Sequence, residues 1–418
     1  MTLVKTSILS IIATTVKMFS GLVIFKAAAV YVGPSGIALI GQFQNFSQII
    51  LGVGSGGTNT GITKYTAEYG KNNPRLEALF STAIKLSIFV SLTVGVTIAA
   101  FANYASISLL RSEDYSSIFI IFGFTLIFFV INGLLLSILN GLKEIKTFIS
   151  ITIIQSVCSL VFTSLLIIFF GLYGALLALV TNQSIVFFIV LWMLRKHQII
   201  KLSNFTGAFD KFEAKKLMGF SAMALTSALV IPVSHLIIRS QIGETLSWEQ
   251  AGYWQAMWSI STMYLMVATT ALITYYLPKL SELQSPKELR NEITNGYKII
   301  IPIIIFLALI IYMSKDLIIK LLFTDDFYPM RELFKWQLVG DTIKMSSWLL
   351  GYLLKAKAMF SAFIIKEIVL SFLFVLFTFI LISRFKLQGV LYAYCLVYII
   401  NFVWTFYLVK PILKMEKI

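Results

Sequence analysis

The 418-residue sequence has few charged residues, few cysteines and few histidines. Charged residues make up only 13% of the chain, and there are two cysteines and two histidines. Soluble globular domains are about 25% charged, so this composition, with 58% apolar residues, excludes a soluble or disordered chain. Because Cys158 and Cys395 lie in separate apolar runs, we expect neither a disulfide framework nor a metal cluster.

The motifs of common catalytic sites are also missing. The sequence has no phosphate-binding Walker loop, no recognisable catalytic triad, no catalytic pair of carboxylates and no Cys/His spacing typical of a metal site. We therefore expect neither ATP hydrolysis nor glycosyl transfer, and no cofactor or metal.

What the sequence does contain is a series of long apolar runs. A membrane-spanning helix needs about 20 mostly apolar residues, so twelve spans would use about 240 residues. Runs such as 299–313 are apolar on every face, which indicates helices. We predict an all-α polytopic membrane protein, with about twelve transmembrane helices in two pseudo-symmetric six-helix bundles around a central cavity. The predicted spans are residues 7–30, 36–63, 79–102, 115–140, 147–170, 173–194, 216–240, 250–277, 296–314, 331–354, 358–383 and 388–409.

The connections between these spans predict the domains and the orientation. Residues 196–215 lack a strong apolar run, so we expect a cytoplasmic linker between an N-terminal bundle, 1–195, and a C-terminal bundle, 216–418. With both termini inside, 21 Lys and Arg residues fall on the inner side and 8 on the outer side. Cytoplasmic loops carry this excess, which predicts a bacterial inner-membrane protein with cytoplasmic termini. The net charge of +15 then reflects topology beside anionic lipid, and no nucleic-acid partner is expected.

A faint internal repeat links the two predicted bundles. Residues 62–65 and 273–276 both begin Ile-Thr and end in Tyr, and each precedes a charged loop with a proline. Because six spans separate the two segments, equivalent helices would run in the same direction. Chance similarity between apolar sequences is the alternative to this duplication.

Several charges lie within the predicted spans, where each costs about 2.5–3.5 kcal/mol or more. Lys17 lies near the middle of the first span and Lys26 nearer its outer end, where snorkelling to the headgroups is the alternative. The two lysines lie on opposite faces unless that helix bends. In the seventh span His235 and Arg239 share a face after Pro232, which predicts a kink. Packing and interfacial anchoring are the respective alternatives for His235 and Arg239.

The tenth predicted span carries a polar stripe. Gln337, Asp341, Lys344, Trp348 and Lys355 recur at spacings that keep them on one helical face. An ion pair between Asp341 and Lys344, which would merely help the helix to insert, is the alternative to a binding site.

Amide and indole side chains lie in the second and eighth spans. They are Gln42, Asn45, Gln255, Trp254 and Trp258. Such groups suit sugar recognition by hydrogen bonding and ring stacking, and polar contacts between helices are the alternative explanation.

The balance of interior charge predicts the class of substrate. Lys17, Lys26, Arg239 and Lys344 stand against one central carboxylate, Asp341, and this imbalance favours an anion. A cation-coupled multidrug exporter, the main alternative, needs mid-depth carboxylates, which the first six spans lack. A polymerase or ligase would need a large periplasmic loop, whereas the longest outside segments have about 15 residues.

Residues 330–341 and 351–358 closely resemble the Wzx flippases, especially the type that moves the lipid-linked precursor of enterobacterial common antigen. Residues 32–36, 61–65 and 174–177 are similar to the same family, which belongs to the multidrug, oligosaccharidyl-lipid and polysaccharide exporter (MOP) superfamily. The resemblance implies two six-helix bundles and a cavity that is often cationic. It also implies a substrate, an O-antigen or common-antigen oligosaccharide on undecaprenyl diphosphate, moved to the periplasmic leaflet by alternating access.

The resemblance also implies site residues and partners. Lys17, Lys26, Gln337, Asp341 and Lys344 match the family at their positions in this sequence. His235 and Arg239 correspond by helix position only, and Gln42 and Asn45 look less fixed. Membrane lipid, and the polymerase and chain-length regulator of the same pathway, are the implied partners.

Overall fold

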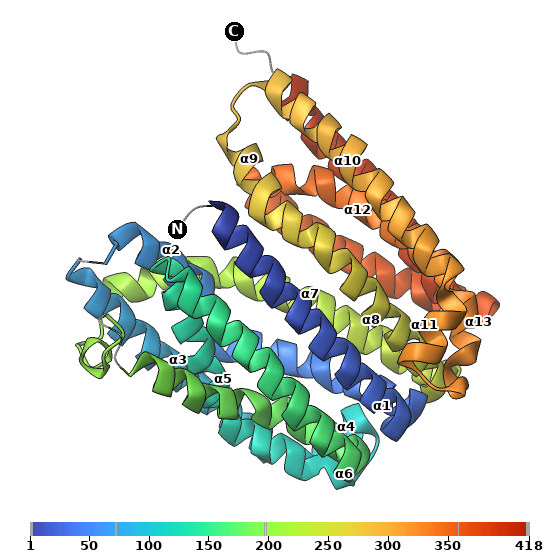
Figure 1. Cartoon of the computed structure of the whole chain (residues 1–418), viewed down its shortest axis with the longest axis horizontal. Coiled ribbons are helices and arrows are strands. Elements are labelled where there is room, and N and C mark those ends of the chain that lie inside the picture. The colour runs from blue at the N-terminus through green and yellow to red at the C-terminus, as the bar shows by residue number, and fades with distance from the viewer. Residues whose placement is uncertain (1–2, 72, 196, 198, 358, 415–418) are drawn as a thin grey trace. The chain divides into compact units, whose positions relative to one another are not determined.

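The computed structural model describes residues 3–71, 73–195, 197, 199–357 and 359–414. These residues form helices joined by short turns, and no strand occurs among them (Figure 1). The α-helices are α1 (Leu3–Gly54), α2 (Asn59–Tyr69), α3 (Arg75–Ala100), α4 (Ala102–Leu110), α5 (Ser116–Gly141), α6 (Ile145–Leu194), α7 (Lys211–Thr245), α8 (Trp248–Ala271), α9 (Leu277–Glu282), α10 (Pro286–Met313), α11 (Lys315–Leu322), α12 (Phe334–Ala356) and α13 (Phe360–Lys414). Three 3-10 segments (Glu113–Tyr115, Leu202–Phe205 and Asp325–Leu333) and a π-helical turn (Leu272–Tyr276) complete the order.

Each predicted span falls largely on helix, although residue 358 of the eleventh lies outside the described part of the chain. By length and composition, seven helices among the described residues are apolar enough to cross a membrane. Three of these, α1, α6 and α13, cross one non-helical residue each, at Gly33, Gly171 and Lys386, so they supply two segments apiece. The more polar α8 and α12 fall on the eighth and tenth predicted spans. The chain is therefore an all-helical multi-pass membrane protein, as the sequence predicts.

The second predicted span differs from the others because it is interrupted at residues 55–58, between α1 and α2. Gly56 and Gly57 adopt φ angles of 59° and 64° there, a conformation that glycine adopts without strain. The hydroxyl of Thr58 donates a hydrogen bond of 2.8 Å to the carbonyl of Ser55. Local bonds of this kind let a broken helix persist in a membrane, because they satisfy freed backbone groups.

The chain forms two compact units, which we describe separately. Unit 1 comprises Met1–Val32 and Leu39–Val233, and unit 2 comprises Gly33–Ala38 and Ser234–Ile418. The predicted bundles 1–195 and 216–418 remain predictions.

The predicted linker, 196–215, belongs to unit 1, although its residues 196 and 198 lie outside the described part of the chain. The linker is held against the beginning of α3. Ser81 Oγ donates to the carbonyl of Ala208 over 3.0 Å, and Lys85 Nζ donates to the carbonyl of Gly207 over 2.7 Å. The segment is thus packed on its own unit.

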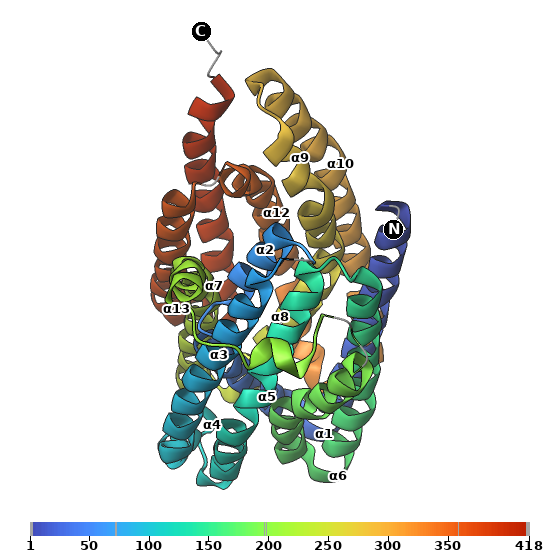
Figure 2. The same ribbon diagram turned by 90° about the vertical axis from the view of Figure 1, so that its left-hand side faces the viewer.

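The core of unit 1 is built by α3, α5 and α6, which lie side by side (Figure 2). Phe43 of α1 meets Phe119 of α5 edge-on, with ring centroids 5.3 Å apart. Helices α3 and α5 approach so closely that a Cβ on Gly95 would lie 2.4 Å from the carbonyl oxygen of Gly123. Small residues permit such contacts between membrane helices, where packing replaces the hydrophobic driving force.

The core of unit 2 is centred on α12, which packs against α8, α10 and α13. Leu349 and Leu353 of α12 are fully buried with Leu272 and Tyr276 of the π-helical turn. Gln337, Asp341 and Lys344 of the polar stripe are buried in this bundle, whereas Lys355 is exposed.

Equivalent turns in the two units support the internal repeat. In α6 the non-helical residue is Gly171 (φ 54°, ψ −130°), and in α13 it is Lys386 (φ 49°, ψ −137°). Three residues further on, Gly174 and Gly389 each pack against a carbonyl eight residues before them. The two sharp turns thus share backbone geometry and the requirement for a small residue.

Candidate functional site

Six of the ten predicted site residues lie in unit 2. Helix α7 supplies His235 and Arg239, α8 supplies Gln255, and α12 supplies the remaining three, Gln337, Asp341 and Lys344. All six side chains are buried, with at most 8% of their surface exposed. Polar groups buried this deeply in an apolar bundle need partners, and those partners define the site.

Asp341 is the most completely bonded of these residues. Its Oδ2 accepts hydrogen bonds from Ser261 Oγ (2.5 Å) and Tyr264 Oη (2.8 Å). Its Oδ1 accepts from Tyr394 Oη (2.7 Å) and Gln337 Nε2 (3.2 Å). Each oxygen thus has two donors, which is about the full capacity of a carboxylate. Asp341 therefore joins α8, α12 and α13 as a structural centre.

Lys344 lies one turn further along α12, with its ammonium among aromatic rings. The distances from Nζ to the ring centroids are 4.8 Å for Trp258, 5.0 Å for Trp348, 5.7 Å for Tyr394 and 5.5 Å for Tyr398. A cation over an aromatic face gains about 0.5–2 kcal/mol, more when water is excluded. We call these four rings the aromatic box. Together they offset much of the cost of burying the charge.

Lys344 and Asp341 do not form the ion pair that the sequence allows at a spacing of three residues. Among the described residues, the ion pairs within 4.0 Å join other side chains, Lys71 with Glu144 and Arg331 with Asp316. The four neutral donors take up Asp341, and the aromatic box holds Lys344. The ammonium therefore keeps its capacity to donate hydrogen bonds to an incoming anion.

Sequence reasoning missed the residues that connect these two charges. Tyr394 donates to Asp341 and also presents its ring to Lys344. Tyr264 and Ser261 come from α8, where their spacing of three residues places them on one face. Tyr394 and Tyr398 are likewise four residues apart on α13. The recurrence of tyrosines at helical spacing within apolar spans was the sequence signal that could have predicted these residues.

A second group in unit 2 surrounds Arg239. Its guanidinium donates to Gln255 Oε1 and lies 5.4 Å from the ring of Trp254, and only 1% of the residue is exposed. The ring of His235 packs edge-on against Trp258, with centroids 4.3 Å apart. Because Trp258 also belongs to the aromatic box, the Arg239 group and Lys344 are neighbours in one polar interior.

The other four predicted site residues lie in unit 1. Lys17 is exposed on the first segment of α1, and Lys26 is half-buried there. Gln42 and Asn45 are buried on one face of the second segment, with 1% and 9% exposure. Their roles remain predictions.

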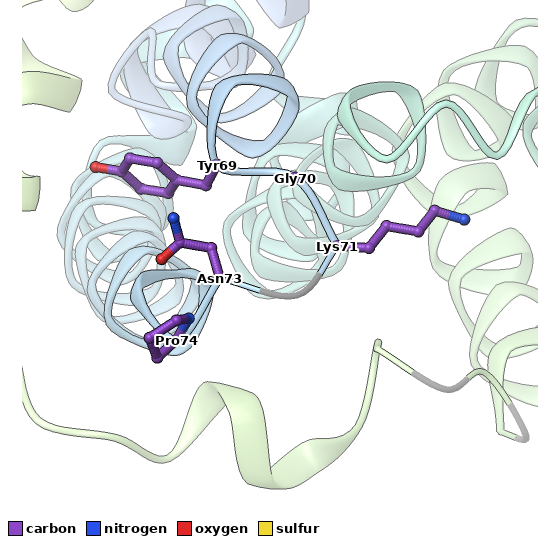
Figure 3. A pocket seen from close by; sticks show the side chains of 5 residues that line it. All are labelled: Tyr69, Gly70, Lys71, Asn73 and Pro74. Atoms are coloured by element: carbon purple, nitrogen blue, oxygen red, sulfur yellow. The ribbon is translucent and has the colours of Figure 1, made fainter.

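Outside the spans, Tyr69 lies at the end of α2 beside a shallow depression of about 530 Å³. Figure 3 shows Tyr69 and Lys71 pointing away from each other across the loop that lines it. Tyr69 Oη donates to Glu213 over 2.7 Å and accepts from Lys216 Nζ over 2.7 Å. Burial raises the pKa of Tyr69, so its hydroxyl stays protonated and ties α2 to α7. None of the predicted site residues lines this depression.

A model of the polysaccharide biosynthesis protein family matches residues 3–284. The chain belongs to this family. The match begins at the first helix and extends to α9, so it includes His235, Arg239 and Gln255 of the site.

Two curated relatives carry the name lipid III flippase, one from Escherichia coli (strain K12) and one from Shigella flexneri. Each is 29% identical to this chain over 402 residues, with 96% of this chain and 97% of the relative covered.

Solved structures of MOP superfamily transporters share the fold. An inward-facing multidrug resistance MATE transporter matches with a TM-score of 0.78 and 15% identity, covering 96% of both chains. A MOP superfamily transporter from Pyrococcus furiosus, whose binding pocket is described as having reversed polarity, matches with a TM-score of 0.70 and 15% identity. That match covers 98% of this chain and 97% of the other. At these identities the likeness establishes the fold alone.

Proposed function

We propose that this protein is a flippase that moves an oligosaccharide linked to undecaprenyl diphosphate from the cytoplasmic to the periplasmic leaflet. The lipid III flippases that it resembles over 96% of its length support this substrate class. The protein carries out transport and not catalysis. We further propose that it resides in the bacterial inner membrane with both termini cytoplasmic, and that the glycan is an O-antigen or common-antigen unit.

The observation that carries the proposal is the state of Lys344. A buried ammonium with aromatic faces around it, and no hydrogen bond or ion pair among the described residues, is ready to bind an anion. The diphosphate of a lipid carrier supplies several oxygen acceptors for it. Charge-assisted bonds of this kind contribute about 1.5–3 kcal/mol each. Arg239, one ring away, adds a second positive charge to the same interior.

A cation-coupled multidrug exporter, the alternative from the same superfamily, requires a carboxylate that exchanges its counter-ion. Asp341 suits that role poorly because both of its oxygens already accept two hydrogen bonds. Releasing it would leave several buried donors unpaired at once, at about 1–3 kcal/mol each. The unit therefore favours an anionic substrate over a cationic drug.

Transport then proceeds by alternating access, with the polyprenyl tail remaining in lipid while the head group crosses. The membrane potential, negative inside, favours the outward movement of an anion by about 2.3 kcal/mol per charge per 100 mV. The chain needs no nucleotide for this step. The polymerase and chain-length regulator of the same pathway are the proposed partners downstream.

Replacing Lys344 by Met tests the proposal, because Met keeps the apolar stem and removes only the charge. Affinity for undecaprenyl diphosphate in nanodiscs, and flipping in proteoliposomes, should fall by at least about tenfold. Lys344→Arg should retain much of both.

The matched control is Lys335→Met on the same helix. Lys335 is exposed and lies 5.4 Å from the ring of Trp336, so it offers the same chemistry outside the buried interior. Its loss should leave both measurements near the wild-type values. Wild-type affinity and flipping in Lys344→Met would remove Lys344 from the mechanism.

A further inference from the structure

Unit 1 contains a row of amide side chains that no charge accompanies. Asn132 of α5 lies within the central part of that helix, and Asn182 and Gln183 lie at the middle of the second segment of α6. Ser159 lies near the middle of the first segment of α6. Amides at such positions face an apolar surround on most sides, and intramembrane polar groups are functional candidates by default.

Two hydrogen bonds join these side chains in pairs. Asn132 Nδ2 donates to Gln183 Oε1 over 2.6 Å, and Asn182 Nδ2 donates to Ser159 Oγ over 2.5 Å. Asn59, the first residue of α2, lies near the same part of α5, because a Cβ on Gly133 would lie 3.3 Å from Asn59 Nδ2. We call Asn59, Asn132, Gln183, Asn182 and Ser159 the amide row.

The amide row begins at the break in the second span. Asn59 follows residues 55–58, where the chain leaves helical geometry before α2 begins. Transporters commonly build substrate sites beside discontinuous membrane helices, since the break exposes backbone and side-chain polar groups at mid-depth.

The hydrogen bonding of the amide row is incomplete. The Oδ1 atoms of Asn59, Asn132 and Asn182 are buried, and none has a hydrogen-bond partner among the described residues. Asn132 itself is only 2% exposed. Rotating an amide by 180° exchanges the positions of its oxygen and nitrogen. It changes which of the two atoms lacks a partner, but one of them still lacks one. An unsatisfied polar group in an apolar interior costs about 1–3 kcal/mol, so a ligand that donates hydrogen bonds to these three oxygens would recover that cost.

The chemistry of the row selects its ligand. Amide ends both donate and accept hydrogen bonds, and so do sugar hydroxyl groups. A phosphate only accepts and an ammonium only donates, so either would satisfy half of the row. No carboxylate, lysine or arginine belongs to the row. We infer that the amide row binds the uncharged sugar hydroxyls of the substrate, as a site separate from the charged interior of unit 2.

This inference rests on the proposed function. Measuring the binding of two lipids distinguishes a failure of the inference from a failure of the proposed function. The probes are undecaprenyl diphosphate and the same lipid carrying a neutral trisaccharide, each measured against the intact protein in nanodiscs. The wild type should bind the glycosylated lipid more tightly. Asn132→Leu and Asn182→Leu should each lower that preference about two- to tenfold and leave affinity for the bare lipid unchanged.

The matched control is Asn401→Leu. Asn401 is also 2% exposed, but its Oδ1 accepts a hydrogen bond of 3.1 Å from Thr405, so its amide oxygen has a partner, unlike that of Asn132. Its variant should keep the wild-type preference. The double variant Asn132→Leu/Gln183→Leu, which removes both partners of one bond, checks that an orphaned Gln183 does not cause the effect. Because the readout is a ratio within one preparation, a partial loss of folded protein does not change it.

Each outcome is decisive. If the wild type does not prefer the glycosylated lipid, or if Asn132→Leu and Asn182→Leu keep the preference, the amide row is structural and the inference is wrong. If neither lipid binds at all, the proposed function fails with it. If Lys344→Met loses the bare lipid while the asparagine variants lose only the glycan preference, both proposals hold.

Discussion

The two units share an order of elements but bury different chemistry. Among the described residues, unit 2 buries four charged side chains, Arg239, Asp341, Lys344 and Lys366. The only buried charged residue described in unit 1 is Glu213, which lies at the beginning of α7, before its apolar span. Elsewhere unit 1 buries hydroxyls and amides. Equivalent helices of the internal repeat therefore differ in the number of charged side chains that they bury.

The difference matters because the substrate class has two parts. A diphosphate calls for fixed positive charge, which is stable in an apolar bundle only with aromatic or hydrogen-bonding support. A glycan calls for neutral groups that both donate and accept. If one unit held both the positive charge and the amides, the charge would lie next to the neutral groups. Placing them in two units keeps the charged groups apart from the neutral ones. The predictions that follow probe this division, beginning with the largest effect.

Replacing Asp341 by Leu should cost about 3–5 kcal/mol in the free energy of unfolding, because four buried donors lose their acceptor together. Asn132→Leu in unit 1 should cost only about 1 kcal/mol, since one of its amide ends is already unpartnered. Thermal unfolding of both variants in the same detergent measures the contrast.

The conservative variant Asp341→Asn is the control for shape. It keeps the size of the side chain and one acceptor oxygen, so its stability should lie between the wild type and Asp341→Leu. Similar small losses in Asp341→Leu and Asn132→Leu would show that the two units do not differ in how they use buried polar groups.

The sequence predicted the spans and the polar stripe because both depend on local information. Apolar length reveals a membrane helix, and spacings of three and four residues reveal a face. The partners of that stripe depend on packing. Tyr264 and Tyr394 come from other helices, and in a uniformly apolar span nothing local marks which face turns inward. The ion pair of Asp341 with Lys344, which the sequence left open as the alternative to a binding site, does not form because two tyrosines, a serine and a glutamine donate to the carboxylate instead.

The interrupted second span and the amide row were hidden for a related reason. The glycines at residues 56 and 57 are a turn signal, but long apolar sequence on either side masked it. Asn132 and Asn182 are isolated polar residues in strongly apolar spans. The hydrogen bonds that they donate to Gln183 and Ser159 depend on how the helices pack, which the local sequence does not reveal.

The equivalent turns at Gly171 and Lys386 give a smaller test of the repeat. Lys386 adopts a positive φ of 49°, which strains a residue with a side chain. Lys386→Gly should therefore stabilise the protein by about 1 kcal/mol, and Gly171→Ala should destabilise it by a similar amount.

Arg384→Gly is the control, because Arg384 is exposed and helical two residues earlier. Glycine there should destabilise the protein by about 1 kcal/mol through backbone entropy. Thermal unfolding gives the sign in each case. Loss of stability in Lys386→Gly would mean that the two turns are not equivalent in energy, although their dihedral angles agree.

The smallest expected effect concerns pH and is confined to the linker of unit 1. His197 Nδ1 accepts hydrogen bonds from the backbone N–H groups of Ile199 (3.2 Å) and Ile200 (3.1 Å). Burial lowers the pKa of His197 below its ordinary value of 6.5, while nearby Glu144 opposes and Lys71 assists this shift. The folded linker therefore holds a neutral imidazole, which acid converts to a cation that cannot accept either bond. An unfolded linker takes up the proton near pH 6.5, so stability is full above that value and is lost as the pH falls toward the lower folded pKa.

Hydrogen exchange of residues 199–205 at pH 7.5 and 5.5, corrected for the intrinsic rate, measures this loss. The linker should open more readily at pH 5.5 in the wild type. His197→Asn, whose amide oxygen accepts the same bonds without titrating, should remove the difference. The amide row has no titratable group, so exchange around Asn132 should be indifferent to this pH change. Equal responses at the two places would show that acid loosens unit 1 as a whole and not through the imidazole.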